Sequence, residues 1–152
     1  DASAGILNKG PMPPKVNTPT QFTIHWVLTN FSTDIRDVTL KAFLGNNVLF
    51  TGVTKSTIDS APIYNEAANE VTWTISRIPA TAGVLGKPVE AIFQLEATPS
   101  AVDEKQFMPL LQETIAHAVD EFTSLELVAQ DAGITTQLPD DPTVGSQGIV
   151  VQ

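Results

Sequence analysis

Four stretches of this sequence alternate apolar and polar residues, and this pattern limits the possible folds more than any other feature. Side chains that alternate with a period of two lie on opposite faces of a β-strand, with one face packed on a core and the other facing solvent. Turn-forming residues separate the stretches, and helix and strand patterns do not follow each other regularly. The sequence therefore predicts an all-β fold, an antiparallel β-sandwich of about seven short strands. The four stretches are 22–28, 38–43, 71–78 and 89–96.

Two tryptophans and two phenylalanines are the predicted anchors of the core. Each is in phase with the aliphatic residues of its own strand, and a buried tryptophan removes on the order of 200 Å² of surface from water. The alternative for the tryptophans is a ligand-binding platform, but sugar-binding aromatic residues more often lie out of phase or on loops. The anchors are Phe22, Trp26, Trp73 and Phe93.

The segment 101–123 fits two kinds of element. Its apolar residues fall at helical spacing, yet the same residues also tolerate an alternating pattern. A sandwich needs closing strands, and the following residues 125–130 are rich in β-formers, so we expect strand. The alternative is one short helix within 101–123. We also expect the strand at 70–80 to pair with the strand at 88–97.

Proline and glycine divide the chain into three parts. Residues 1–20 form a proline-rich lead-in, which we expect to be extended and to act as a linker. Residues 21–135 form the sandwich domain, and residues 136–152 form an exit linker rich in Pro, Asp and Gly, followed by a short tail strand. Because the chain begins without methionine, we expect it to be an excised piece of a longer protein.

The charge balance argues against several partners. The 8 Lys and Arg residues and 17 Asp and Glu residues give a net charge of −9. Such a chain repels phosphate backbones and anionic lipid surfaces, so we expect no nucleic-acid partner. No apolar run approaches the roughly 20 residues that span a bilayer, so we expect no membrane insertion. The absence of cysteine excludes disulfides and zinc–thiolate sites and is typical of a bacterial or a cytosolic protein.

Four motifs follow one another along the chain: FTIHWVLTNFS (22–32), DVTLKAFLGNNVLFTG (37–52), EVTWTISRIPA (70–80) and VEAIFQLEATPS (89–100). In this order they resemble the bacterial conserved-repeat domain of unknown function, an immunoglobulin-like module found in tandem in large surface proteins. The resemblance covers roughly residues 15–100. It implies an immunoglobulin-like, extracellular, non-enzymatic module, and it brings no catalytic residues with it.

The chain departs from this family at one motif. The acidic residue that usually precedes the family's leucine–proline pair is replaced by Ala42, and the pair itself reads Leu44–Gly45. Any role of the family carboxylate is therefore missing here.

Two groups of acidic residues suggest calcium, because carboxylates on turns between tandem sandwiches supply hard oxygen ligands. The alternative is that these residues cap turns and keep the exterior acidic. We expect no other cofactor. The calcium candidates are Asp34 with Asp37, and Asp131 with Asp140 and Asp141.

The two histidines are weak candidates for a metal site. His25 lies on the polar phase of its strand, so we expect it to face solvent. His117 is followed by Asp120 and Glu121, and a helix would place His117 and Glu121 on one face. A single pair of this kind makes a poor metal site.

Two lysines could form an internal isopeptide bond with an asparagine. That reaction needs an apolar site that deprotonates the lysine and a buried carboxylate. Lys15 and Lys41 are the candidates, although the alternation of Lys41 with its neighbours indicates that it points outward. No G-x-S-x-G motif or equivalent spacing organises the Ser, His and Asp residues into a catalytic site.

The sequence and the resemblance together predict a non-enzymatic structural or spacer module, one repeat of a larger bacterial cell-surface or secreted protein. Its expected partners are neighbouring domains of the same chain, and we expect the isolated domain to be a monomer. The alternative is an adhesin-type module that binds carbohydrate or a host or cell-surface protein, stabilised by calcium.

Overall fold

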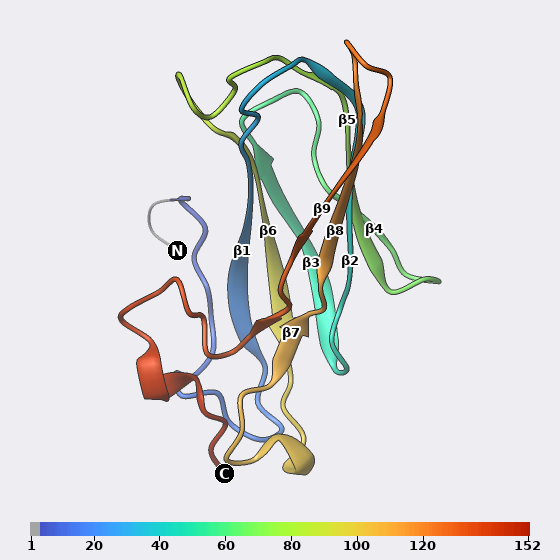
Figure 1. The fold of residues 1–152 in the computed structure, drawn as a ribbon. Helices are drawn as coiled ribbons and strands as arrows, with labels where there is room; N and C mark the ends of the chain where they lie inside the picture. The colour runs from blue at the N-terminus through green and yellow to red at the C-terminus, as the bar shows by residue number, and fades with distance from the viewer. Residues whose placement is uncertain (1–3) are drawn as a thin grey trace.

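Two antiparallel β-sheets pack face to face in the computed structural model, which describes residues 4–152 (Figure 1). The first three residues of the predicted lead-in lie outside the described residues. One sheet has three strands in the order β1-β6-β3, and the other has five in the order β4-β5-β2-β8-β9. The strands of these sheets are β1 Thr20–Leu28, β2 Ile35–Phe43, β3 Val48–Ser56, β4 Ile63–Asn65, β5 Glu70–Ile78, β6 Val89–Ala97, β8 Thr114–Asp120 and β9 Glu126–Asp131.

Short elements complete the chain at one end of the sandwich. A small two-stranded sheet pairs β7 (Pro109–Leu111) with β10 (Ile134–Thr135). Two single turns of 3₁₀-helix, Ala101–Asp103 and Gly145–Gly148, are the helical elements of the described residues. The predicted all-β antiparallel β-sandwich is confirmed.

The core lies between the two large sheets, on the faces that the alternation predicted. The side chains of Phe22 and Phe93 are almost completely buried, as is Trp73, and Trp26 is 5% exposed. The Trp26 and Phe93 rings meet edge to face with 4.9 Å between their centroids. Trp26 Nε1 donates a hydrogen bond to Thr114 Oγ1 on β8, which ties the two sheets together. Neither indole ring is therefore exposed to a ligand.

The predicted pairing of the strand at 70–80 with that at 88–97 is wrong. β5 pairs with β2 and β4, whereas β6 pairs with β1 and β3 in the other sheet. Alternation shows which face of a strand is buried, but both sheets of a sandwich bury their inner faces in the same core. The apolar residues of β5 and β6 therefore meet across the core and not along a shared edge.

Segment 101–123 contains strands, as expected, and its helix is only the 3₁₀ turn at Ala101–Asp103. β8 lies between β2 and β9, and the hairpin to β9 turns at residues 121–125. Phe122, which contributed to the helical spacing, lies in this turn and is 87% exposed. Phe122 is therefore an apolar residue on the surface and not part of the core.

The lead-in packs across the outer face of the three-stranded sheet. Its backbone accepts a hydrogen bond from Gln94 Nε2 at Leu7 O (3.2 Å), and Lys9 O accepts one from the Gln21 backbone (2.7 Å). Asn8 Oδ1 accepts a second bond from Gln94 at 2.8 Å. Gln94 lies in the polar phase of the alternating stretch 89–96, but it is buried because the lead-in covers it.

The C-terminal end of the chain and the last part of the lead-in, just before β1, lie at the same end of the sandwich (Figure 1). Val16 N donates to Val151 O, and Val151 N donates to Pro14 O, both at 2.9 Å. We call residues 14–16 and 150–151, which are joined by this parallel bridge, the terminal clasp. The boundaries at residues 20 and 135 stay predictions.

Candidate functional site

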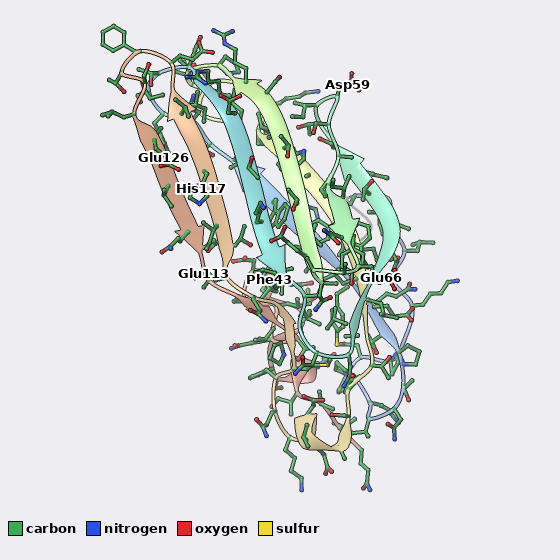
Figure 2. The ribbon with its side chains drawn as sticks, turned by 90° about the vertical axis from the view of Figure 1, so that its right-hand side faces the viewer. Phe43, Asp59, Glu66, Glu113, His117 and Glu126 are labelled. Carbon is green, nitrogen blue, oxygen red and sulfur yellow. The ribbon has the colours of Figure 1, made fainter. Side chains whose placement is uncertain are left out.

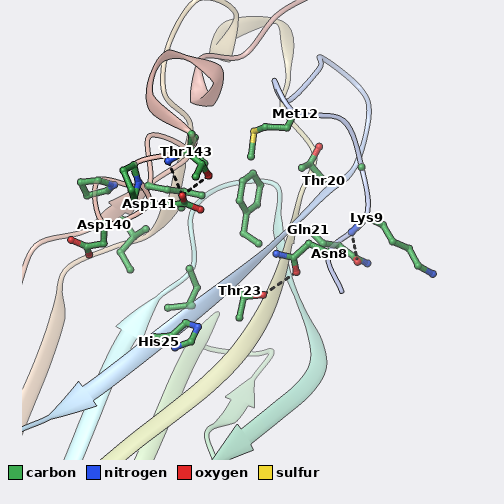
Figure 3. Close-up of a pocket in the computed structure, with 18 residues that line it drawn as sticks. Asn8, Lys9, Met12, Thr20, Gln21, Thr23, His25, Asp140, Asp141 and Thr143 are labelled. Atoms are coloured by element: carbon green, nitrogen blue, oxygen red, sulfur yellow. Dashed lines mark hydrogen bonds between the residues drawn. The ribbon is translucent and has the colours of Figure 1, made fainter. Parts of the chain in front are cut away.

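A groove of about 780 Å³ runs along β1 (Figure 3). One wall is the lead-in, and the other is the loop 138–144. Phe22 and Ile24 contribute apolar surface, and Thr23 and His25 contribute polar side chains. Its volume is in the range of ligand-binding pockets. The groove is therefore the main candidate site of the described residues.

Hydrogen bonds hold the two walls of the groove in place. On the lead-in side, Thr23 Oγ1 lies 2.9 Å from Asn8 Oδ1, and Lys9 N donates to Gln21 Oε1. On the loop side, Asp141 Oδ1 accepts bonds from the hydroxyl (2.6 Å) and backbone (2.9 Å) of Thr143. The hydroxyl first and then the backbone bond lower the pKa of Asp141, so its carboxylate is charged at neutral pH.

A smaller depression of about 330 Å³ lies on the outer face of the five-stranded sheet. Phe43, which is 45% exposed, borders it together with Lys41 and His117. Figure 2 shows Phe43 and His117 on this face of the sheet. Lys41 Nζ lies 3.5 Å from Glu70 Oε1.

The calcium candidates lie in separate local arrangements. Asp34 Oδ1 accepts a hydrogen bond from Ala80 N at 2.6 Å, and its other oxygen pairs with Arg77. Asp37 pairs with Arg36. These contacts are those of turn caps and surface ion pairs.

The second group of calcium candidates is divided in the same way. Asp131 Oδ1 accepts a bond from Ala132 N, at the end of β9. Asp140 and Asp141 lie in the loop that borders the groove. Across residues 4–152, no three or more His, Cys, Asp or Glu side chains gather into a metal-binding group. Calcium binding stays a hypothesis, and this geometry offers it no assembled ligand set.

The histidines have carboxylate partners from other strands. His25 was expected to face solvent, but it is only partly exposed, and its Nδ1 lies 2.7 Å from Glu90 Oε1 on β6. His117 Nδ1 lies 3.1 Å from Glu126 Oε1 on β9. Because residues 114–120 form a strand, His117 does not share a helix face with Glu121, and that metal arrangement is absent.

Neither candidate lysine has the apolar surroundings that an isopeptide bond requires. Lys15 is exposed within the terminal clasp. The side chain of Lys41 is 50% exposed beside Glu70. Neither amine therefore lies in the buried apolar site that the reaction needs.

A charged cluster joins β5 to the loops before β2 and after β8, at the far end of the sandwich. Arg77 Nε donates to Glu121 Oε1 at 2.9 Å, and Arg77 also pairs with Asp34. The hydrogen bond from Arg77 to Glu121, followed by the charge of Asp34, raises the pKa of Arg77. The cluster links the ends of β5, β2 and β8 and is a structural contact.

Asp120 caps the turn between β8 and β9, which gives a prediction for acid stability. Its carboxylate accepts hydrogen bonds from the Thr33 hydroxyl and from the backbones of Thr123 (2.7 Å) and Phe122 (2.9 Å). The bond from Thr33, and then that from Thr123, lower the pKa of Asp120 below its ordinary 3.8. The pKa of Asp120 is lower in the folded than in the unfolded protein. The charged carboxylate therefore stabilises the fold fully above about pH 3.8, and this stabilisation is lost as the pH falls through the folded pKa.

We expect Asp120→Asn to be less stable than the original protein at pH 7 and the difference to shrink below pH 3.8. Urea unfolding of both proteins between pH 7 and pH 2.5 measures this. Asp59→Asn is the matched control, because the Asp59 carboxylate has no hydrogen bond to another described residue, and it should follow the original protein at every pH. A constant difference for Asp120→Asn across the whole range would contradict the prediction.

Asp140 and Asp141 were predicted as site residues from the sequence, but the lead-in wall of the groove was not. Asn8 and Lys9 come from the lead-in, and the other wall comes from a loop about 130 residues later. Neither segment has a periodic pattern, and only their turn-forming composition could be recognised.

No described helix is long and apolar enough to cross a membrane.

Comparisons with known proteins show a fold and no sequence family. No protein-family model matches the chain, and no curated protein matches it. Among solved structures, it is similar to a variant of BcpA, the major pilin subunit of Bacillus cereus, at 12% identity and a TM-score of 0.52. That match covers 82% of this chain and 36% of the pilin, so the chain spans about a third of the pilin's length.

Two structures of the major pilin SpaD from Corynebacterium diphtheriae are also similar. Its domains D2 and D3 match at 11% identity and a TM-score of 0.45, over 80% of this chain and 47% of that one. The full-length pilin matches at 13% identity and a TM-score of 0.46, over 80% and 31%. The structural neighbours are thus bacterial major pilins, and the likeness to BcpA bears out the immunoglobulin-like sandwich. The membership of the conserved-repeat family stays a prediction.

Proposed function

We propose that this chain is a non-enzymatic structural module that bears load within a larger bacterial cell-surface or secreted protein, located outside the cell. The similarity to part of a major pilin supports this proposal, because that protein is the major subunit of a pilus and this chain matches 36% of it. The net charge of −9 favours neighbouring protein domains over nucleic acid as partners. We expect the isolated module to be a monomer.

The terminal clasp is the observation that carries the proposal. Val16 and Pro14 run parallel to Val151, and backbone hydrogen bonds of 2.9 Å join them. A force that pulls the two chain ends apart acts along these strands in opposite directions. It therefore loads the hydrogen bonds together, in shear, and cannot open them one after another.

Further hydrogen bonds continue the clasp into the sandwich. Lys105 N donates to Val150 O at 2.9 Å, and Val150 N donates to Gln106 O at 3.0 Å. Val150 is completely buried. A pull on the C-terminal end is thus resisted by backbone bonds on two sides and by an apolar side chain in the core.

A proline at residue 151 tests this role. Val151→Pro removes the N–H that donates to Pro14 O, so we expect a lower unfolding force when the protein is pulled by its two ends, and a loss of about 1–3 kcal/mol of equilibrium stability. Single-molecule force spectroscopy and urea unfolding measure the two effects.

Val151→Ala is the matched control, because it keeps the N–H and shortens a side chain that is only partly buried. Its unfolding force should stay close to that of the original protein. If Val151→Pro unfolds at the same force as Val151→Ala, the clasp does not bear the load. The adhesin-type alternative stays a prediction, with the depression beside Phe43 as a place where a glycan could bind.

A further inference from the structure

The outer edge of β1 has backbone groups, at Thr23 and Val27, that form no hydrogen bond with another described residue. The Gln21 backbone N–H points away from β6, since it donates to Lys9 O, and the regular register of β1 on β6 repeats this orientation at every second residue. The backbone groups of Thr23 and Val27 therefore point outward. No hydrogen bond joins them to another residue in 4–152. This edge can accept a further strand.

The opposite sheet extends one strand beyond this edge. The hydrogen bond from Trp26 to Thr114 places β1 opposite β8, so that no strand within residues 4–152 faces β9. All six residues of β9 are exposed. Leu127 is opposite Ala118 in the register, and Ala118 is buried, so both side chains lie on the core-facing side of their sheet. Leu127 nevertheless remains 43% exposed.

These two observations define one position. A strand added to the outer edge of β1 would be the fourth strand of the small sheet, and its inward side chains would cover Leu127. The groove along Thr20–His25 provides space beside β1, with Ile24 as part of its wall. A strand added there would form backbone hydrogen bonds with β1 and would pack apolar side chains on Leu127.

The charge near this position is mainly negative, because the groove carries Asp140 and Asp141 against Lys9, and it therefore favours a basic occupant. Asp131, on the core-facing side at the end of β9, and Asp140, in the wall of the groove, form no ion pair with another described residue. A second copy of this chain fits poorly, because β9, its fully exposed edge strand, carries Glu126 and Asp131 at its ends. Like charges placed opposite each other destabilise strand pairing.

We propose that the outer edge of β1 and the uncovered face of β9 form a binding site for an extended segment of another polypeptide. The segment adds to the sheet as a strand, carries apolar side chains at alternate positions toward Leu127, and has a Lys or Arg near Asp131 and Asp140. This site is independent of the terminal clasp, which lies outside the groove.

A short peptide tests the site on the whole chain. The probe is an acetylated and amidated octapeptide in which valine and threonine alternate between two terminal lysines. We expect saturable binding by titration calorimetry, and slower amide hydrogen exchange at Thr23 and Val27 in NMR spectra. The same peptide with two terminal glutamates should bind more weakly, and high salt should reduce this difference.

Two substitutions on β9 give the decisive comparison. Leu127→Asp and Val128→Asp add the same charge at exposed positions, but Val128 is opposite His117 in the register and faces outward. Leu127→Asp should weaken binding by roughly tenfold or more, because it removes the apolar contact. Val128→Asp should leave the affinity within about twofold.

Three results would overturn the proposal: no saturable binding up to millimolar peptide, equal weakening by both substitutions, or protection of β9 amides in place of Thr23 and Val27. Analytical ultracentrifugation without peptide tests the other possible occupant, a second copy of this chain. A concentration-dependent dimer that Leu127→Asp abolishes would show that a second copy fills the position, and it would also overturn the proposal.

Discussion

Replacing Trp73 with alanine should destabilise the protein by about 3–5 kcal/mol, because a large buried ring is lost and the surrounding side chains close the cavity only in part. Trp73 is fully buried at the centre of β5, opposite Leu40 on β2. Its Nε1 also donates a hydrogen bond to Ser60 O at 3.1 Å, which holds the loop before β4. Since a domain has roughly 5–15 kcal/mol of stability, this loss is a large share of the free energy of unfolding.

Urea unfolding monitored by far-UV circular dichroism measures this change. Thr74→Ala is the control from the same strand, since the Thr74 side chain faces solvent, and it should stay within about 0.5 kcal/mol of the original protein. Trp73→Phe keeps an aromatic ring, so its loss should be smaller than that of Trp73→Ala. A loss below about 1.5 kcal/mol for Trp73→Ala would show that this ring does not support the core.

Thr136→Val should cost about 2–4 kcal/mol, although it changes the shape of the side chain very little. Thr136 is fully buried, and its hydroxyl donates to Gly148 O (2.6 Å) and accepts from Met108 N (3.0 Å). Valine leaves both backbone groups buried without a partner, and each such group costs about 1–3 kcal/mol. The hydroxyl thus joins the chain before β7 to the segment that leads into the terminal clasp.

Thr136→Ser separates the hydroxyl from the rest of the side chain. It keeps the hydrogen-bonding group and removes one methyl, so its loss should be about 1 kcal/mol. Thermal unfolding of the three proteins ranks them, with valine below serine. The reverse order would show that packing of the methyl group, and not the hydroxyl, holds the two segments together.

Alternation predicted the buried faces of the strands because a side chain's face depends only on its position within its own strand. Val71, Trp73 and Ile75 point to the core for this reason. The same pattern could not show that β5 and β6 belong to different sheets, since strand neighbours depend on contacts far apart in the sequence. Leu40 pairs with Trp73, but nothing in the sequence of either strand alone indicates this pairing.

The candidate site was harder to predict than the core. Its groove needs Lys9 and Asp140 on opposite walls, and both residues lie in aperiodic segments whose paths are set by tertiary hydrogen bonds. Gln94 shows the same effect within a strand, because a polar residue in an outward phase is buried once the lead-in crosses it. Turn composition identified these segments as irregular, but it could not show where they pack.

The terminal clasp also affects how such a module could be duplicated or exchanged between genes. The lead-in covers Gln94, and the tail places Val150 in the core, so the sandwich is completed by residues outside its main strands. A gene segment that encoded only β1 to β9 would lack both. Recombination would have to carry the flanking codons together with the strands, because the unit that folds is longer than the sandwich.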